Sequence, residues 1–233
     1  MKKGVRYISS DLLLSAVRNN AEWCELVAHS HGVHSQWLGQ AWSTTIRMPP
    51  FYPNVVSIES GMKQETVAGI AAELPENCAC KDSFAELELG EYGFKVLFEA
   101  NWIALTDSLS SEVACSPASS VTSSDELAEW IAAWGETPIG KTTFLPELLG
   151  SKVRFIFCKN GEKISSGLIA NHSVNSVGIS NCFGDSKEIS QCIRRAYEWA
   201  KGLPVVSYSS DVELKEMQDR GFKELGDLRV WVR

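Results

Sequence analysis

The sequence predicts an α+β protein with a mixed, mostly antiparallel sheet flanked by helices. Two apolar runs, 152–158 and 164–170, lie on either side of Asn160-Gly161, a dipeptide typical of the tight turn of an antiparallel hairpin. Before them, residues 125–134 carry apolar side chains at helical spacing behind Ser123 and Glu126, which have the spacing of a capping box. Hairpins and capped amphipathic helices in one chain favour this fold class.

The composition is that of an ordinary globular protein and argues against several classes. The 233 residues include 22 Lys and Arg against 29 Asp and Glu, a formal net charge of -7, which disfavours broad binding of nucleic acid or anionic lipid. No apolar run is long enough for a membrane span, and the first residues are too polar for a secretory signal. Seven scattered cysteines, an odd number, indicate reduced thiols. We therefore expect a cytoplasmic protein with no membrane or nucleic-acid partner.

A composition shift divides the chain into two lobes. Residues 108–124 are rich in serine and nearly free of charge, which predicts a linker between an α+β lobe at 1–107 and a second lobe at 125–233. In the first lobe, apolar spacing predicts two short helices within 13–27, a strand at 55–58, a helix at 61–74, and consecutive antiparallel strands at 83–89, 94–98 and 102–105.

The second lobe has clearer boundaries between its elements. The helix at 125–134 and a second short helix at 144–149 precede three strands, 152–158, 164–170 and 174–183. Asp185 and Glu188 have the spacing of a second capping box, at the start of a helix that runs to Gly202. A strand at 205–208, a helix capped at Ser210, and a pair of strands at 222–225 and 228–232 complete the order.

This order, together with Gly221-Phe222 after the last helix, resembles the core of the GNAT superfamily of acyl-CoA N-acyltransferases. The resemblance covers 125–233 and implies a GNAT-like fold in which the strand at 174–183 splays from the strand at 205–208. In that superfamily the pantetheine arm of the cofactor lies in the cleft between these two strands. We also hypothesise that the first lobe, an N-terminal α/β lobe, is a worn second copy of the same half-fold, that is, a copy that has lost its characteristic features.

The resemblance implies a cofactor, acetyl-CoA or another acyl-CoA, and the residues that bind it. By position these are Ser180, Asn181, Cys182 and Phe183 along the thioester arm, and Gly184, Ser186 and Lys187 at the phosphates, where a helix start favours an anion. The phosphate-binding turn is degenerate in this chain. Many members have two glycines there, whereas this chain has one glycine and the carboxylates of Asp185 and Glu188.

Acyl transfer needs a base for the amine and an acid for the leaving thiolate, and two residues are candidates for this chemistry. Tyr208 ends a predicted strand, and Met217 stands where many members have the tyrosine that acts as acid. His172 follows the strand at 164–170, and imidazole is the side chain most often used for base catalysis near neutral pH. Both have plain structural interpretations as well, Tyr208 as a core aromatic and His172 as a loop histidine bonded to backbone or water.

Two functions remain open from the sequence. The first is an acyl-CoA-dependent N-acyltransferase that modifies an amine of a small molecule or a protein, without a metal. The second is a non-catalytic GNAT-like binding or regulatory protein that has lost the cofactor chemistry. The order of elements favours the first, and the degenerate turn and Met217 favour the second.

Overall fold

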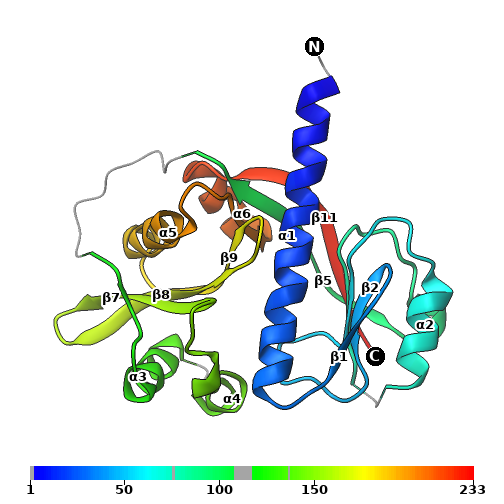
Figure 1. The fold of residues 1–233 in the computed structure, drawn as a ribbon, viewed down its shortest axis with the longest axis horizontal. Helices are drawn as coiled ribbons and strands as arrows, with labels where there is room; N and C mark the ends of the chain where they lie inside the picture. Colours follow the sequence, from blue (N-terminus) through cyan, green and yellow to red (C-terminus); the bar gives the residue numbers. More distant parts are fainter. Residues whose placement is uncertain (1–2, 75–76, 108–116, 136) are drawn as a thin grey trace.

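The computed structural model describes residues 3–74, 77–107, 117–135 and 137–233 (Figure 1). Its helices are α1 (Lys3–Ser30), α2 (Gln64–Ala72), α3 (Ser124–Trp134), α4 (Thr137–Thr143), α5 (Ser186–Ala200) and α6 (Asp211–Asp219), with 3-10 turns η1 (Gly90–Tyr92) and η2 (Pro146–Leu148). Its strands are β1 (Ser35–Leu38), β2 (Ala41–Thr44), β3 (Val55–Ser57), β4 (Ala79–Asp82), β5 (Lys95–Leu105), β6 (Ser119–Ser120), β7 (Val153–Asn160), β8 (Lys163–His172), β9 (Val177–Phe183), β10 (Val205–Ser209) and β11 (Lys223–Val232).

We call the two predicted lobes, 1–107 and 125–233, the first and second half of the chain. One sheet runs through both halves, in the order β1-β2-β3-β4-β11-β5-β10-β9-β8-β7-β6. The pairs β3/β4 and β9/β10 are parallel, and the other pairs described are antiparallel, so the predicted mixed, mostly antiparallel sheet is confirmed. The two halves exchange their last strands at the centre. Strand β5 of the first half pairs with β10, and β11 of the second half pairs with β4.

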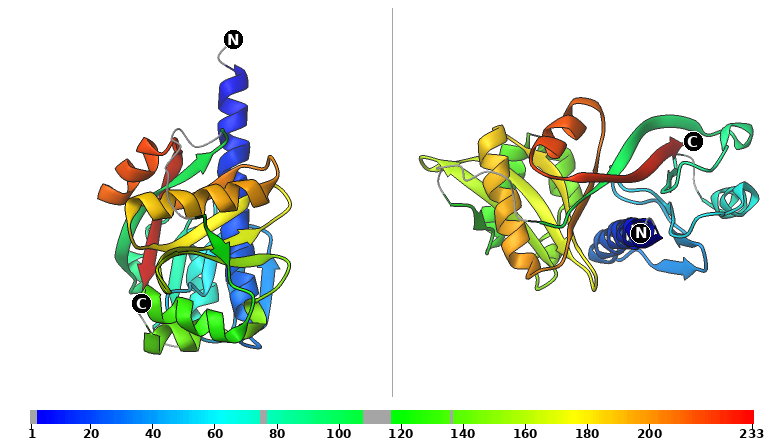
Figure 2. Two further views of the ribbon diagram at one scale, coloured as in Figure 1. Left: turned by 90° about the vertical axis from the view of Figure 1, so that its left-hand side faces the viewer. Right: turned by 90° about the horizontal axis from the view of Figure 1, so that it is seen from above.

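Helices cover both faces of the sheet (Figures 1 and 2). Side chains alternate between the faces along a strand, so Phe155 of β7 packs with α3 while its neighbour Ile156 packs with α5. The end-on view in Figure 2 shows α1 on one side of the central strands and α6 on the other. The apolar core therefore consists of two layers, one on each face of the sheet.

Helix α1 is a single helix of 28 residues, where the sequence predicted two short ones. The expected break fell at Asn20, a residue type that commonly caps helices, but Asn20 Oδ1 accepts from Lys81 Nζ at 2.9 Å. Its neighbour Asn19 is buried, and its amide nitrogen donates to the carbonyl oxygens of Asn171 and Ser176, each at 3.3 Å. Because a contact with the second half satisfies this side chain, the helix continues through it.

Several predicted strands differ from those observed. Residues 83–89 form a loop, because Ser57 Oγ accepts from the Ser83 amide (2.7 Å) and the Asp82 carboxylate accepts from the Leu87 amide (2.8 Å) in place of strand partners. The strands expected at 94–98 and 102–105 are one strand, β5, and the final pair is likewise one strand, β11. Strands β5 and β11 pair with each other along their length, and this pairing keeps each strand extended where a turn was expected. The register of the pair is irregular at 224–226 and 230–231.

The prediction of a second short α-helix at 144–149 is wrong: that range holds only the 3-10 turn η2, and the helix α4, which was not predicted, ends before it. Within the predicted linker, residues 108–116 lie outside the described residues, and Ser119–Ser120 form β6 against β7. The six cysteines in the described ranges are all free thiols. A search of those ranges finds no helix with the length and apolar character of a membrane span.

Candidate functional site

Strands β9 and β10 form a V, as the sequence resemblance implied. They start side by side, with Val205 opposite Val177 and Val206 opposite Gly178, and no further pair between them occurs in the described structure. Beyond this closed end, Ser207 Oγ donates to the carbonyl oxygen of Ile179 at 2.8 Å. The edge of β9 that faces β10 is therefore free of strand partners from Ser180 to its end.

A cleft of about 560 Å³ occupies the open end of the V, a volume in the range of small-molecule sites. Its walls come from β9, β10, α5 and α6, with Trp134 at the end of α3. Helices α3 and α5 lie on opposite faces of the sheet, so the cleft passes between the strands from one face toward the other. The lining residues are Trp134, Ser180, Asn181, Cys182, Phe183, Gly184, Ile189, Ser207, Tyr208, Ser209, Glu213, Glu216, Met217 and Arg220.

A β-bulge shapes the β9 wall of the cleft. Ile169 of β8 pairs with Ser180 and Gly167 pairs with Phe183, so Asn181 and Cys182 together face one residue of β8. Asn181 has the positive φ of 53°, a left-handed conformation that asparagine tolerates. The extra residue of a bulge is left out of the ladder. Ser180 Oγ is buried and has no hydrogen-bond partner in the described residues, so this wall presents polar groups that a ligand can satisfy.

The turn after β9 leads directly into α5. Gly184 has φ +100°, and a β-carbon there would collide with the Ser165 carbonyl oxygen and with Ser166. Asp185 caps the helix, its carboxylate accepting from the Lys187 amide at 2.9 Å. Glu188 turns away and accepts from Ser165 Oγ at 2.7 Å, so only one of the two carboxylates occupies a donor of the helix start.

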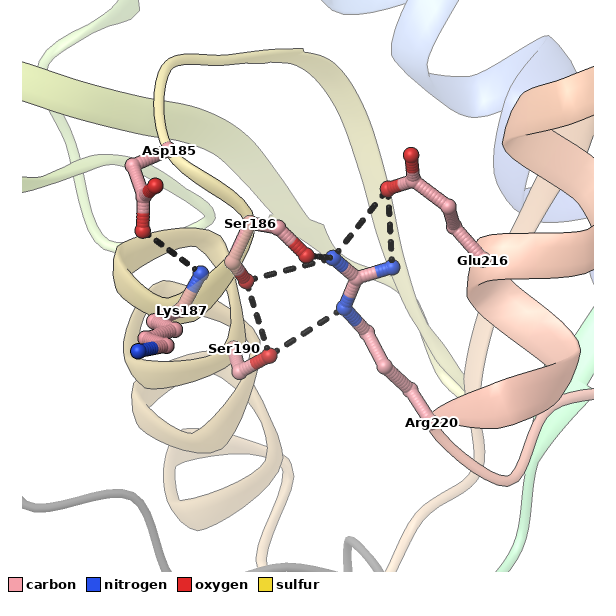
Figure 3. A network of polar contacts seen from close by, with 6 residues as sticks. All are labelled: Asp185, Ser186, Lys187, Ser190, Glu216 and Arg220. Carbon is pink, nitrogen blue, oxygen red and sulfur yellow. Dashed lines mark hydrogen bonds and ion pairs between the residues drawn. The ribbon is translucent and has the colours of Figure 1, made fainter.

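Arg220, at the end of α6, brings a positive charge to the same helix start (Figure 3). Its guanidinium donates to the Ser186 hydroxyl (2.6 Å), the Ser186 carbonyl (3.2 Å) and Ser190 Oγ (3.1 Å). Glu216 pairs with it at 3.4 Å from one turn earlier in α6. The side chain is only 10% exposed, so this charge is held in one place and lines the cleft.

Tyr208 lies at the other wall, opposite Trp102 of β5. Its ring contacts Trp102 edge-on (centroids 5.6 Å apart) and stacks on Phe98 (6.3 Å), and the Lys81 ammonium lies 4.2 Å from its centroid. Lys81 is buried and donates to Asn20 Oδ1 at 2.9 Å. Residues of the first half therefore fix the orientation of Tyr208 in the cleft of the second half.

His172 lies apart from this cleft. It is opposite Val177 at the closed end of the V, and its ring contacts Trp199 edge-on at 5.4 Å. Both line a separate hollow of about 430 Å³ with Lys152 and Glu22. The structure thus brings Tyr208 and residues 180–184 together, with Ser186 and Lys187 at the start of α5, and leaves His172 elsewhere.

Sequence reasoning missed the residues that α6 and α3 contribute. Glu213, Glu216 and Arg220 were assigned no role, and Trp134 was placed only in the core. The available signal was the three-to-four residue spacing of the α6 side chains, which puts them on one helix face. In the ranges that the structure covers, no cluster of three or more His, Cys, Asp or Glu side chains is placed to hold a metal ion.

No family model matches the sequence, and no curated protein matches it. Solved structures do match the fold. A GCN5-related N-acetyltransferase from Kribbella flavida superposes with a TM-score of 0.62 at 12% identity, covering 93% of this chain and 95% of its own. A functionally unknown conserved protein from Staphylococcus epidermidis gives 0.60 at 8% identity (86% and 94% covered). An acetyltransferase of the GNAT family, so named provisionally, from Novosphingobium aromaticivorans gives 0.56 at 13% identity (90% and 94% covered). The fold is the GNAT fold, over nearly the whole chain.

Proposed function

We propose that the protein is an acyl-CoA-dependent N-acyltransferase that modifies an amine of a small molecule or a protein. The observation that carries this proposal is the V between β9 and β10, whose β9 wall has an unpaired backbone edge, a bulge and an unpartnered Ser180 hydroxyl. An extended amide-containing arm pairs with such an edge as an added strand does. The described GNAT-fold neighbours support the same class of reaction.

Bound acyl-CoA would supply an acyl group activated as a thioester, which passes from sulfur to the amine nitrogen while the amine proton ends on the thiol. The chain's own groups have three roles in this proposal. The β9 edge orients the arm, and amide N–H groups between Ser180 and Phe183 stabilise negative charge on the acyl oxygen. Tyr208, which lines the cleft, donates a proton to the leaving sulfur. His172 has no part in it, because it lies at the closed end of the V.

The phosphate end depends on Arg220. Asp185 occupies one amide of the α5 start and repels an anion, as the degenerate turn led us to expect. Arg220 supplies a fixed cation at the same helix start, where its guanidinium donates to the Ser186 and Ser190 hydroxyls. We propose that the Arg220 guanidinium supplies a phosphate contact that compensates for the second glycine missing from the phosphate-binding turn.

The same contacts favour a second candidate function, a non-catalytic GNAT-like binding or regulatory protein. Asp185 and Glu216 satisfy groups that would otherwise receive phosphate oxygens, and Met217 lines the cleft with a thioether that has no proton to donate. In this case the cleft binds another ligand, or it binds none and is only a feature of the fold.

We expect acetyl-CoA to raise the midpoint of thermal unfolding by roughly 5 to 10 °C when it is present at about 100 times its Kd. Cys182→Trp should abolish this shift, because the larger side chain fills the cleft that Cys182 lines. Gly184 is unsuitable for this test, since any side chain there collides with Ser165. Val212→Trp is the matched control, because Val212 is 74% exposed and lies outside the cleft wall. No shift for the unmodified protein at millimolar acetyl-CoA favours the second candidate.

Arg220→Leu should weaken CoA binding about tenfold and reduce its dependence on salt, because one charge-assisted contact to phosphate is lost. Titration calorimetry at two salt concentrations measures both effects. Lys215→Leu, a charge change on an exposed α6 residue outside the cleft wall, is the control. Unchanged or tighter binding by Arg220→Leu would mean that Arg220 blocks the phosphate end, which is the behaviour of the second candidate.

We also propose that the first half is a worn second copy of the half-fold whose own cleft is closed. Its β1-β2-β3-α2-β4 order matches β7-β8-β9-α5-β10, with the parallel pair at the same place. The turn before α2 has a positive-φ glycine, Gly61, as the turn before α5 has Gly184. The Glu86 carboxylate accepts from the Gly61 amide and from Ser60 Oγ, both at 2.7 Å, and so occupies that turn. The titration should therefore give one CoA per chain, and two would contradict this proposal.

A further inference from the structure

An exposed aromatic side chain of the first half lies at the α3 end of the cleft. Trp134 lines the cleft, and the ring of Phe51 contacts it edge-on, with centroids 5.7 Å apart and planes at 79°. Phe51 is 60% exposed, a larger fraction than the 43% of Trp37 or the 37% of Phe98. The first half therefore contacts a residue of the cleft wall, on the face of the sheet away from α5 and α6.

The backbone of Phe51 is held in a costly conformation. Its φ is 71°, in the left-handed region that a bulky side chain seldom adopts. The turn around it is closed by the Tyr52 amide, which donates to the Pro49 carbonyl oxygen at 3.3 Å. Glycine would meet the requirements of this turn without strain. A phenylalanine that is both strained and exposed indicates that the ring itself has a use, and the Trp134 ring that it contacts lines the cleft.

A second aromatic pair stands across the same cleft. Tyr208 lines it, and Phe98, 37% exposed, stacks on the Tyr208 ring. Phe98 and Phe51 both come from the first half, whereas the rings they contact belong to the second. Two aromatic residues of the cleft wall, Trp134 and Tyr208, thus each contact an exposed phenylalanine of the first half, and an apolar group bound against these rings is removed from water.

The acidic residues of α6 select the other end of such a molecule. Glu213 lines the cleft near Cys182, where burial and the Glu213 charge raise the pKa of that thiol. Glu216 is instead paired with Arg220 at the phosphate end. An amine that arrives as an ammonium ion is attracted toward Glu213, while its apolar part remains at the aromatic side chains. This division of the cleft fits an amine at one end and an aromatic group at the other.

We infer that Phe51 and Trp134 form the acceptor subsite of this cleft and that the acceptor is a small primary amine carrying an aromatic group. The inference rests on the proposed function for the reaction at the amine, but binding of the amine can be measured without acyl-CoA. Phe51 contacts the acceptor directly in this arrangement, and Trp134 forms the inner surface of the subsite.

Calorimetry with 2-phenylethylamine and with ethylamine tests the subsite directly. We expect the protein to bind 2-phenylethylamine at least about tenfold more tightly, and Phe51→Gly to remove about tenfold of that preference without changing ethylamine binding. Phe51→Tyr should retain the preference. Ile46→Ala, 53% exposed in the same loop, should leave it unchanged. Phe51→Gly should also unfold at no lower temperature than the original protein, because glycine relieves the left-handed strain that offsets the lost ring contact.

The outcomes separate this inference from the proposed function. Equal binding of both amines, or a preference that survives Phe51→Gly, overturns the subsite even if acetyl-CoA still stabilises the protein. A Phe51-dependent preference in a protein that shows no response to acetyl-CoA supports the subsite and removes the transferase. Loss of the preference in Ile46→Ala as well would show that the loop fold, not the Phe51 ring, is responsible, and would overturn the inference.

Discussion

Trp130→Ala should lower the free energy of unfolding by about 3 to 5 kcal/mol, because it removes a fully buried tryptophan from a closely packed aromatic cluster. Trp130 is 0% exposed, and its ring meets Phe155 and Phe183 edge-on, each with centroids 5.1 Å apart. Its indole N–H also donates to the Ile156 carbonyl oxygen at 3.0 Å. Urea unfolding at equilibrium, monitored by far-UV circular dichroism, measures the change.

The loss should reach the cleft as well, since Phe183 lines it and rests on Trp130. We expect Trp130→Ala to weaken acetyl-CoA binding in addition to destabilising the fold. Trp130→Phe is the control, because it keeps most of the ring volume and should cost about 1 to 3 kcal/mol, mainly for the lost hydrogen bond to the Ile156 carbonyl oxygen. Equal stability of the alanine variant and the original protein would mean that this cluster does not support the second half.

Gly178→Ala should destabilise the protein by about 3 kcal/mol or more, from overpacking and from broken buried hydrogen bonds together. Gly178 lies at the closed end of the V, opposite Val206. A β-carbon there would overlap Asn19 Oδ1 and lie 2.6 Å from Asn171 Oδ1. These two buried side chains join α1 to β8, with Asn171 Nδ2 donating to Asn19 Oδ1 at 3.0 Å.

A double-mutant cycle with Asn19→Ala identifies the cause. In that background the overlapping oxygen is gone, so Gly178→Ala should cost less than it does in the original protein. Thermal unfolding of the four proteins gives the coupling. An additive result would place the strain with Asn171 or the backbone, and an undiminished stability of the single variant would contradict the close contact between α1 and the V.

Local features of the fold were predictable because they depend on residues a few positions apart. The cap of α3 is formed by Ser123, whose hydroxyl accepts from the Glu126 amide, and the cap of α5 by Asp185, both as the sequence indicated. The β7–β8 hairpin also follows from its turn residues. The V between β9 and β10 was implied by the resemblance to the GNAT superfamily, which rested on the order of elements.

Contacts between elements far apart in the chain were not predictable, and they decide the site. The exchange of β5 and β11, the approach of Arg220 to Ser186 and the contact of Phe51 with Trp134 join residues far apart in the chain. Such contacts leave no periodic pattern, since each depends on where a whole element is packed. The sequence alone therefore determined the elements, their caps and the likeness to a known fold. Only the tertiary structure decided which charges and rings meet in the cleft, because the packing of whole helices and strands against one another places them.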